Sequence, residues 1–339
     1  MKNSQKSSAK QKISVFLSSL ISAAMKNIFT ILLFALFFTS CMQVQRNKTF
    51  EFTYEGKTLK YEVARNEATV SKRSEKISGD VKIPQSVTFA GKEYKVTSIG
   101  DEAFGWCTSL TSVTIPSSVK TIGERAFEGC DSLTNVIIPN GVTKIKEAAF
   151  GSCGGLTNVS LPKSVKTIGE CPFWGKNLKS INVAKDNSHY CSENGVLFDA
   201  PKKTLIQYPI GTKDKYVIPN SVNTIGPGAF MYCDSLTDVT ISNNVEIIGR
   251  GAFGACKGLT SVTIPSSVKT IDERAFAFCE ALASITILRS TPPNVSESSF
   301  MYCDIPESFH LYVPAESVEK YKTAKGWSKY ADKIKAIEK

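Results

Sequence analysis

The stretch LTSVTIPSSVKTI stands at residues 110–122 and again, letter for letter, at residues 259–271. A segment of this length does not recur by chance, and a single catalytic core has no use for two copies. It belongs to a longer pattern, L-x-x-V-x-I-P-x-x-V-x-x-I-G-x-x-A-F-x-x-C, whose phenylalanine recurs from Phe104 to Phe127 and onward. A fixed period of about 20 to 50 residues is the mark of a solenoid, in which stacked copies, here called rungs, bury a common core.

Eight phenylalanines follow the template: Phe104, Phe127, Phe150, Phe173, Phe230, Phe253, Phe276 and Phe300. Within a rung the piece V-x-I alternates with period two, which predicts a short strand with one buried face. Val113 and Ile115 should therefore point inward, while Thr114 faces solvent. Proline ends the strand because it cannot donate to a ladder, and the glycine of I-G is expected at a turn that is costly for other residues.

The pattern resembles the leucine-rich repeats of the BspA-like family of bacterial surface proteins, which use I-P-x-S-V and I-G-x-x-A-F. The resemblance covers roughly residues 96–303 and implies a repeat solenoid with short parallel strands on a concave face. It also implies a role in adhesion to host matrix proteins or neighbouring cells. Pro172 and Ser299 depart from the alanine of the template, and no cysteine stands at position 176.

The flanks and one interruption complete the predicted organisation. We expect a linker and β cap over residues 41–95 before the array at 96–303, and a small helical cap over 304–339. Irregular rungs about 177–220 include two apolar pieces, Val196–Phe198 and Leu205–Ile206, whose polar connection predicts a hairpin.

The C-terminal cap should begin with FHLYVP as the last strand and continue as a helix over residues 315–334. Both ends of a solenoid expose core unless they are covered. Trp327 and Tyr330 are therefore interpreted as packing residues of the cap rather than as a ligand site.

Residues 1–40 are interpreted as a signal or targeting segment. They hold five lysines and no acid, and an apolar run at Ile28–Phe38 is too short to span a bilayer. The following FTSC resembles a bacterial lipobox in which Cys41 would carry lipid and anchor the protein to a membrane. An ordinary signal peptide or an N-terminal anchor is the alternative, and translation could start at Met1 or Met25. We therefore expect an exported lipoprotein, located at the bacterial outer membrane or cell surface.

Seven of the ten cysteines stand three residues after a template phenylalanine: Cys107, Cys130, Cys153, Cys233, Cys256, Cys279 and Cys303. One cysteine per rung predicts a column of buried thiols, which pack as small apolar groups, rather than disulfide pairs. Metal-ligand spacing is missing, so neither a metal nor another cofactor is expected. Cys171 and Cys191 fall outside the column, and a bridge between them stays open.

Candidates for catalysis are few. The sequence has only two histidines, His189 and His310, and a nucleophile needs a base within hydrogen-bond reach. Asp186 lies near His189, a pairing more typical of a solvated turn than of a dyad. The formal net charge of +10 falls by half without residues 1–40, which is too little to indicate nucleic-acid binding. We therefore expect a protein that is not an enzyme.

The remaining candidate is the outward side of the V-x-I strands. Such a polar sheet predicts recognition of a macromolecule, with a protein as the first candidate partner. A glycan-binding lipoprotein is the alternative, with the loops near Trp174, Tyr190 and Tyr232 as its candidate site, and a spacer without a ligand is another. The proposed binding face comprises Ser112, Thr114, Asn135, Asn158, Ser160, Asn182, Asp238, Thr240, Ser261, Thr263 and Thr286.

Overall fold

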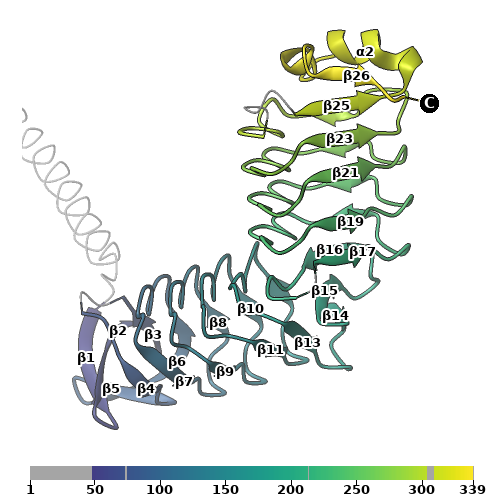
Figure 1. Cartoon of the computed structure of the whole chain (residues 1–339). Coiled ribbons are helices and arrows are strands. Elements are labelled where there is room, and N and C mark those ends of the chain that lie inside the picture. The colour runs from purple at the N-terminus through teal and green to yellow at the C-terminus, as the bar shows by residue number, and fades with distance from the viewer. Residues whose placement is uncertain (1–47, 73–74, 213, 304–308, 339) are drawn as a thin grey trace, which may run out of the picture. The chain divides into compact units, whose positions relative to one another are not determined.

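The computed structural model describes residues 48–72, 75–212, 214–303 and 309–338 (Figure 1). The predictions for residues 1–47, including the lipobox at Cys41, lie outside these ranges. Within them, short strands and turns make up most of the chain, and the α-helix α2 has only six residues. No helix of the described ranges is long and apolar enough to cross a bilayer.

Six strands precede the first full rung: β1 (Lys48–Tyr54), β2 (Lys57–Ala64), β3 (Glu67–Ser71), β4 (Gly79–Lys82), β5 (Ser86–Phe89) and β6 (Lys92–Ile99). β2 and β3 pair antiparallel, whereas β3 pairs in parallel with β6. β6 and β4 then pair in parallel with the first strands of the array. This segment covers the N-terminal end of the core, since Tyr61 of β2 and Val70 of β3 are buried and belong to the same apolar cluster as the first rungs.

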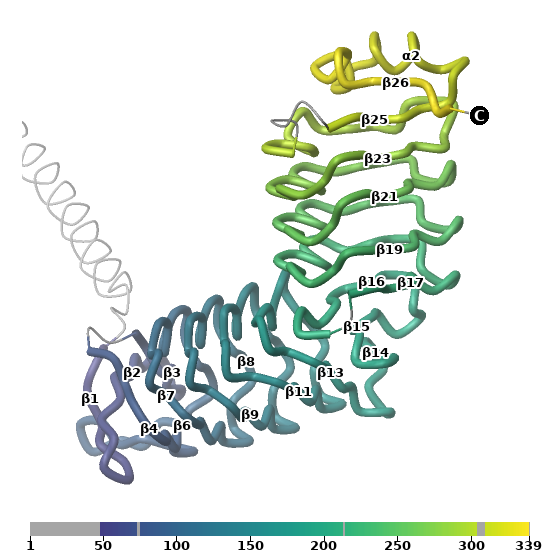
Figure 2. Tube along the Cα trace, viewed as in Figure 1, coloured from purple at the N-terminus to yellow at the C-terminus, as the bar shows by residue number. Residues whose placement is uncertain are grey.

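Most rungs contribute two short strands, and within each sheet the equivalent strands of neighbouring rungs pair in parallel (Figure 2). The strands that carry V-x-I are β7 (Leu110–Thr114), β9 (Asn135–Ile137), β11 (Asn158–Leu161), β13 (Ser180–Val183), β17 (Lys215–Val217), β19 (Asp238–Thr240), β21 (Ser261–Ile264) and β23 (Ser284–Ile287). The second strands are β8 (Thr121–Ile122), β10 (Lys144–Ile145), β12 (Thr167–Ile168), β18 (Thr224–Ile225), β20 (Ile247–Ile248), β22 (Thr270–Ile271) and β24 (Asn294–Val295). The sequence predicted only the first set, because a strand of two residues shows no alternation.

The register of the first strands is the predicted one. Val113 pairs with Val136 on the next rung, and both side chains are at most 5% exposed, whereas Thr114 is exposed. Because side chains alternate across a strand, a slip of one residue would exchange these two faces. The inward valines and isoleucines thus form continuous apolar columns, one residue per rung.

The glycine of I-G has a different reason from the predicted one. Neither Gly123 nor Gly169 has a positive φ, so no turn geometry requires glycine there. A Cβ built on Gly123 would instead lie 2.5 Å from the carbonyl carbon of Gly100 on the preceding rung, and one on Gly169 would lie 2.3 Å from the amide nitrogen of Glu147. Close approach of neighbouring backbones is what favours glycine at these positions.

The template phenylalanines stack into two buried ladders. Ring centroids of Phe104 and Phe127 lie 5.0 Å apart, and Phe253 lies 4.9 Å from Phe230 and 5.1 Å from Phe276. These spacings follow the spacing of paired strands, about 4.8 Å, because each ring occupies the same place in its rung. The predicted solenoid with a parallel strand stack is confirmed.

The predicted cysteine column lies beside these ladders, and all seven of its thiols are buried. Cys130 Sγ donates to the Phe104 carbonyl at 3.2 Å, and Cys256 Sγ donates to the Phe230 carbonyl at 3.0 Å, so the thiols bridge neighbouring rungs. Burial raises the pKa of the Cys130 thiol to about 12, which keeps it protonated and unreactive at neutral pH. Cys171 and Cys191 contact other groups, the carbonyls of Gly228 and Asp199.

The irregular segment folds as three antiparallel strands, β14 (Tyr190–Glu193), β15 (Val196–Asp199) and β16 (Thr204–Gln207), of which β15 and β16 form the predicted hairpin. β16 then pairs in parallel with β18 and so restarts the second set of strands. β15 is apolar on both faces: Leu197 packs into the core of the preceding rungs, while Val196 and Phe198 pack into the core of the following ones.

The C-terminal cap differs from the prediction in two ways. The expected helix over 315–334 is limited to α2 (Val318–Thr323), flanked by the single turns η1 (Ala315–Ser317) and η2 (Ser328–Tyr330). Ala324 is extended and Gly326 has a φ of +81°, so the helix ends there. FHLYVP forms β25 (His310–Val313), but β26 (Ile334–Ala336) pairs in parallel with it and is the last strand.

Trp327 and Tyr330 have the packing role that the sequence predicted. Both side chains are at most 1% exposed and contact the ring of Phe300, the last member of the ladder, at centroid distances of 5.8 and 5.4 Å. Their polar atoms are satisfied, since Trp327 Nε1 donates to the Pro293 carbonyl and the Tyr330 hydroxyl donates to the Glu297 carbonyl, both at 2.8 Å.

Candidate binding site

The strand face proposed from the sequence is mostly solvent-exposed but is divided among three sheets. β7 and β9 belong to one, β11 and β13 to another, and β19, β21 and β23 to a third. Exposed members are Thr114, Asn135, Asn158, Ser160, Asn182, Asp238, Thr240, Ser261 and Thr263, whereas Ser112 and Thr286 are half-buried. Equivalent residues lie in register within a sheet.

Some of these polar side chains are already hydrogen-bonded to neighbouring side chains. Ser112 Oγ donates to the Asp80 carboxylate at 2.6 Å, and Ser180 Oγ donates to Asn158 Oδ1 at 2.6 Å. The face also carries two exposed apolar residues, Ile137 and Val217. It is therefore an extended surface, mostly polar, with local hydrogen bonds.

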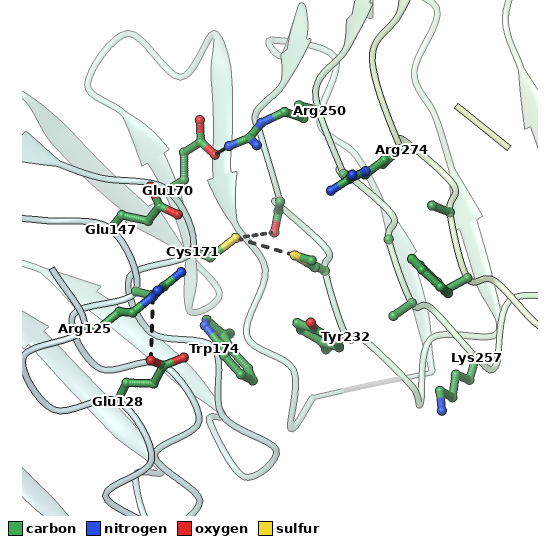
Figure 3. Close-up of a pocket in the computed structure, with 18 of the residues that line it drawn as sticks. Arg125, Glu128, Glu147, Glu170, Cys171, Trp174, Tyr232, Arg250, Lys257 and Arg274 are labelled. Atoms are coloured by element: carbon green, nitrogen blue, oxygen red, sulfur yellow. Dashed lines mark hydrogen bonds and ion pairs between the residues drawn. The ribbon is translucent and has the colours of Figure 1, made fainter. Parts of the chain in front are cut away.

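A groove of about 690 Å³ lies elsewhere, along the turns that contain the A-F pairs (Figure 3). We call it the turn-side groove. It is lined from both sides of the irregular segment, by Trp174 and Glu170 before it and by Tyr232, Arg250 and Phe278 after it. Its volume is within the range of about 300–1,000 Å³ that is typical of ligand sites.

Contacts across the groove hold its two sides together. The rings of Trp174 and Tyr232 stack with centroids 4.9 Å apart, and Arg250 forms an ion pair with Glu170. Cys171 Sγ lies 3.7 Å from the Gly228 carbonyl and 4.0 Å from Met231 Sδ. Burial raises the pKa of the Cys171 thiol to about 12, which disfavours the reactive thiolate.

The charges of the groove are largely paired. Lys257 lies 3.4 Å from Glu280, and Arg125 lies 3.7 Å from Glu128. Within the described part of the chain, the guanidinium of Arg274 has no carboxylate partner. Figure 3 shows Arg274 on the side of the groove opposite Arg125.

Part of this site is predicted by the sequence. The predicted loops near Trp174 and Tyr232 do lie together in the groove, whereas the predicted loop near Tyr190 does not line it. Tyr190 is half-buried, and its hydroxyl accepts a hydrogen bond from the Ile168 amide at 2.9 Å. Phe278 was missed, although it follows Phe276 by two residues just as Tyr232 follows Phe230.

Asp186 and His189, the two catalytic candidates that are close in sequence, each contact a different residue. Asp186 binds Lys163 at 3.3 Å, and the exposed ring of His189 contacts Ser188 Oγ at 3.0 Å. His310 lies on β25, in a different sheet from the strands of the irregular segment. Among the described residues, no three histidine, cysteine or acidic side chains are grouped to hold a metal ion.

Known proteins share this architecture. A family model described as the BspA type leucine rich repeat region matches residues 81–194 and 212–322 in six copies, which is more than half of the chain. The chain belongs to the BspA-type leucine-rich repeat family. The family model does not match residues 195–211, which include β15 and β16 of the irregular segment.

Two solved structures share the BspA-type solenoid. The pneumococcal vaccine antigen PcpA is 19% identical with a TM-score of 0.56, over 86% of this chain and 99% of that one. A leucine-rich repeat protein from Eubacterium ventriosum is 24% identical with a TM-score of 0.52, over 79% of this chain and 78% of the other. At these identities the likeness shows the fold. No curated protein matches the sequence significantly.

Proposed function

We propose that this BspA-type protein is a non-enzymatic binding protein of the cell envelope, which recognises a protein partner on a host matrix or a neighbouring cell. The observation that carries the proposal is the parallel stacking of the rungs. It presents one surface position repeatedly, as in the series Thr240, Thr263 and Thr286 on paired strands. A repeated surface suits a macromolecule, which can contact several rungs at once.

The strand face can be tested with two added charges. Thr114→Glu and Thr263→Glu together should weaken binding to a matrix protein more than either change alone, because the two residues lie on different sheets of the face. Both side chains are exposed, so the melting temperature should stay unchanged. The measurement is titration against a panel of purified extracellular matrix proteins, with a glycan array in parallel.

Thr291→Glu is the matched control, since Thr291 is exposed in a bend outside the strands of the face. It should bind as the wild type does. Unaltered binding by the double variant would remove the strand face from the proposal. Turnover of a peptide or glycan that His189→Ala abolishes would contradict the non-enzymatic function itself.

Attachment to the envelope is proposed to depend on a lipid at Cys41. Cys41→Ala should then leave the protein unprocessed or release it from membranes, since each buried methylene of an acyl chain contributes about 0.8 kcal/mol. Fractionation of cells and mass spectrometry of the mature N-terminus provide the measurement. Cys171→Ala is the control for loss of a cysteine, and normal maturation of the Cys41 variant would exclude the lipobox.

A further inference from the structure

One template position on the turn side carries an unusual series of residues. It follows each ladder phenylalanine by two residues and holds Tyr232, Ala255, Phe278 and Tyr302 on four successive rungs. All four have a positive φ, between 56° and 63°, a region that bulky side chains rarely adopt. Tyr232, Phe278 and Tyr302 are nevertheless 40–48% exposed to solvent. The same position has a positive φ on earlier rungs, at Trp106, Gly129 and Ser152, so the conformation belongs to the template, and it is the succession of exposed rings that distinguishes these rungs.

These exposed rings stack in the same way as the buried ladder. Phe278 and Tyr302 are neighbours with centroids 4.6 Å apart, and Tyr232 stacks on Trp174 at 4.9 Å. Between the two pairs stands Ala255, whose amide donates to Ala277 O at 2.7 Å as that of Tyr232 donates to Gly254 O at 2.9 Å. Ala255 therefore occupies the template position at which the rungs on either side carry the aromatic rings of Tyr232 and Phe278.

The missing ring leaves a slot in the exposed stack. Tyr232 and Phe278 are two rungs apart, which corresponds to about 10 Å. A ring inserted over Ala255 would lie about 5 Å from each neighbour, within the range of about 4.5–7 Å for aromatic pairs. All three residues line the turn-side groove, so the slot opens into a cavity rather than onto a flat surface.

A positively charged side chain in the groove, Arg274, indicates which kind of residue would stand next to an inserted aromatic ring. Arg274 belongs to the same rung as Phe278 and also lines the groove, where it has no ion pair among the described residues. A guanidinium binds a carboxylate with two parallel hydrogen bonds. Tryptophan, tyrosine, arginine and methionine, all present in this groove, are the residues enriched at protein interfaces.

We propose that the turn-side groove docks a protein segment in which an aromatic residue stands next to an aspartate or glutamate. The aromatic ring inserts between Tyr232 and Phe278 above Ala255, and the carboxylate binds Arg274. The proposal deepens the proposed function, on which it rests, by naming the chemistry of the partner. It assigns recognition to a surface other than the strand face.

The first test fills the slot with an aromatic ring from the protein itself. Ala255→Tyr places a ring at a backbone conformation that Tyr232 and Phe278 already adopt, so the variant should fold. The probe is an array of hexapeptides that pair Phe, Tyr or Trp with Asp or Glu, each beside versions with the ring changed to Ala or the acid changed to its amide. Fluorescence anisotropy with the best peptide should show at least a tenfold loss of affinity for Ala255→Tyr.

Two further variants keep the result interpretable. Phe278→Ala removes one wall of the slot and should also weaken binding, whatever the behaviour of Ala255→Tyr. Arg274→Gln should abolish the difference between acid-bearing peptides and their amides. Trp106→Ala is the control, because Trp106 has the same template position and a φ of 61° but does not line the groove. It should bind as the wild type does.

Equal affinity of wild type and Ala255→Tyr, or binding that is indifferent to the aromatic residue, would overturn the proposal. So would binding of neutral oligosaccharides, tested as malto- and chito-oligosaccharides, that Ala255→Tyr blocks, because the slot would then take a sugar ring. A matrix protein that binds Ala255→Tyr normally but the Thr114/Thr263 double variant poorly would refute this inference and leave the proposed function standing.

Discussion

Replacing Phe253 with alanine should lower the free energy of unfolding by about 3–5 kcal/mol, the usual cost of truncating a buried phenylalanine. The ring is fully buried between Phe230 and Phe276, which lie 4.9 and 5.1 Å away. Truncation leaves a cavity in the middle of a ladder and removes a stacking partner from both neighbours. Urea denaturation followed by circular dichroism measures the loss.

Phe278→Ala is the matched comparison, because the same residue type is removed from the neighbouring rung but from an exposed site. With 44% of its surface in solvent, Phe278 should contribute less than about 1 kcal/mol to stability. If the two variants lost equal stability, the assignment of Phe253 to the core and Phe278 to the surface would be wrong.

Trp327→Ala should have a second large effect, at the end of the array. Trp327 is fully buried, contacts the rings of Phe300 and Tyr321, and donates to the Pro293 carbonyl at 2.8 Å. Loss of a buried tryptophan costs about 3–5 kcal/mol. Because it also uncovers the last ladder ring, we expect association of the protein as well as a lower melting temperature. Size-exclusion chromatography and thermal melting provide the two measurements.

Trp327→Phe separates packing from hydrogen bonding at this site. It keeps an aromatic ring beside Phe300 but leaves the Pro293 carbonyl without its donor, so it should cost about 1–3 kcal/mol and keep the protein monomeric. Trp106→Ala, at a residue that is 57% exposed, should change neither quantity. A monomeric, stable Trp327→Ala variant would mean that the cap is dispensable.

The repeat allowed most of the fold to be predicted, because a solenoid imposes one environment on each template position. The inward direction of Val113 and the packing of Trp327 both followed from position alone. Physical detail within a rung was harder to predict. The second strand has two residues and no visible alternation. Glycine is required at position 123 by the close backbone of the preceding rung, which the sequence does not show.

The turn-side groove was only partly predictable, because it joins residues on either side of an irregular segment. Trp174 and Tyr232 are 58 positions apart, yet their rings stack. The period does place Tyr232 and Phe278 in one series, so comparing residues down a template column could have found the slot. Nothing in the sequence indicated that Arg250 would reach Glu170 while Arg274 would lack an ion pair among the described residues.

The two-sided strand β15 has a consequence for how the array loses its structure. Leu197 belongs to one apolar core and Phe198 to the other, and Leu205 and Ile206 of β16 divide in the same way, so the two cores meet at this hairpin instead of merging. In a stacked array each copy is stabilised only by its neighbours. Denaturant should therefore melt the halves as two cooperative blocks, coupled through β15 and the stacked pair of Trp174 and Tyr232. A single free energy of unfolding would then describe each block rather than the whole chain.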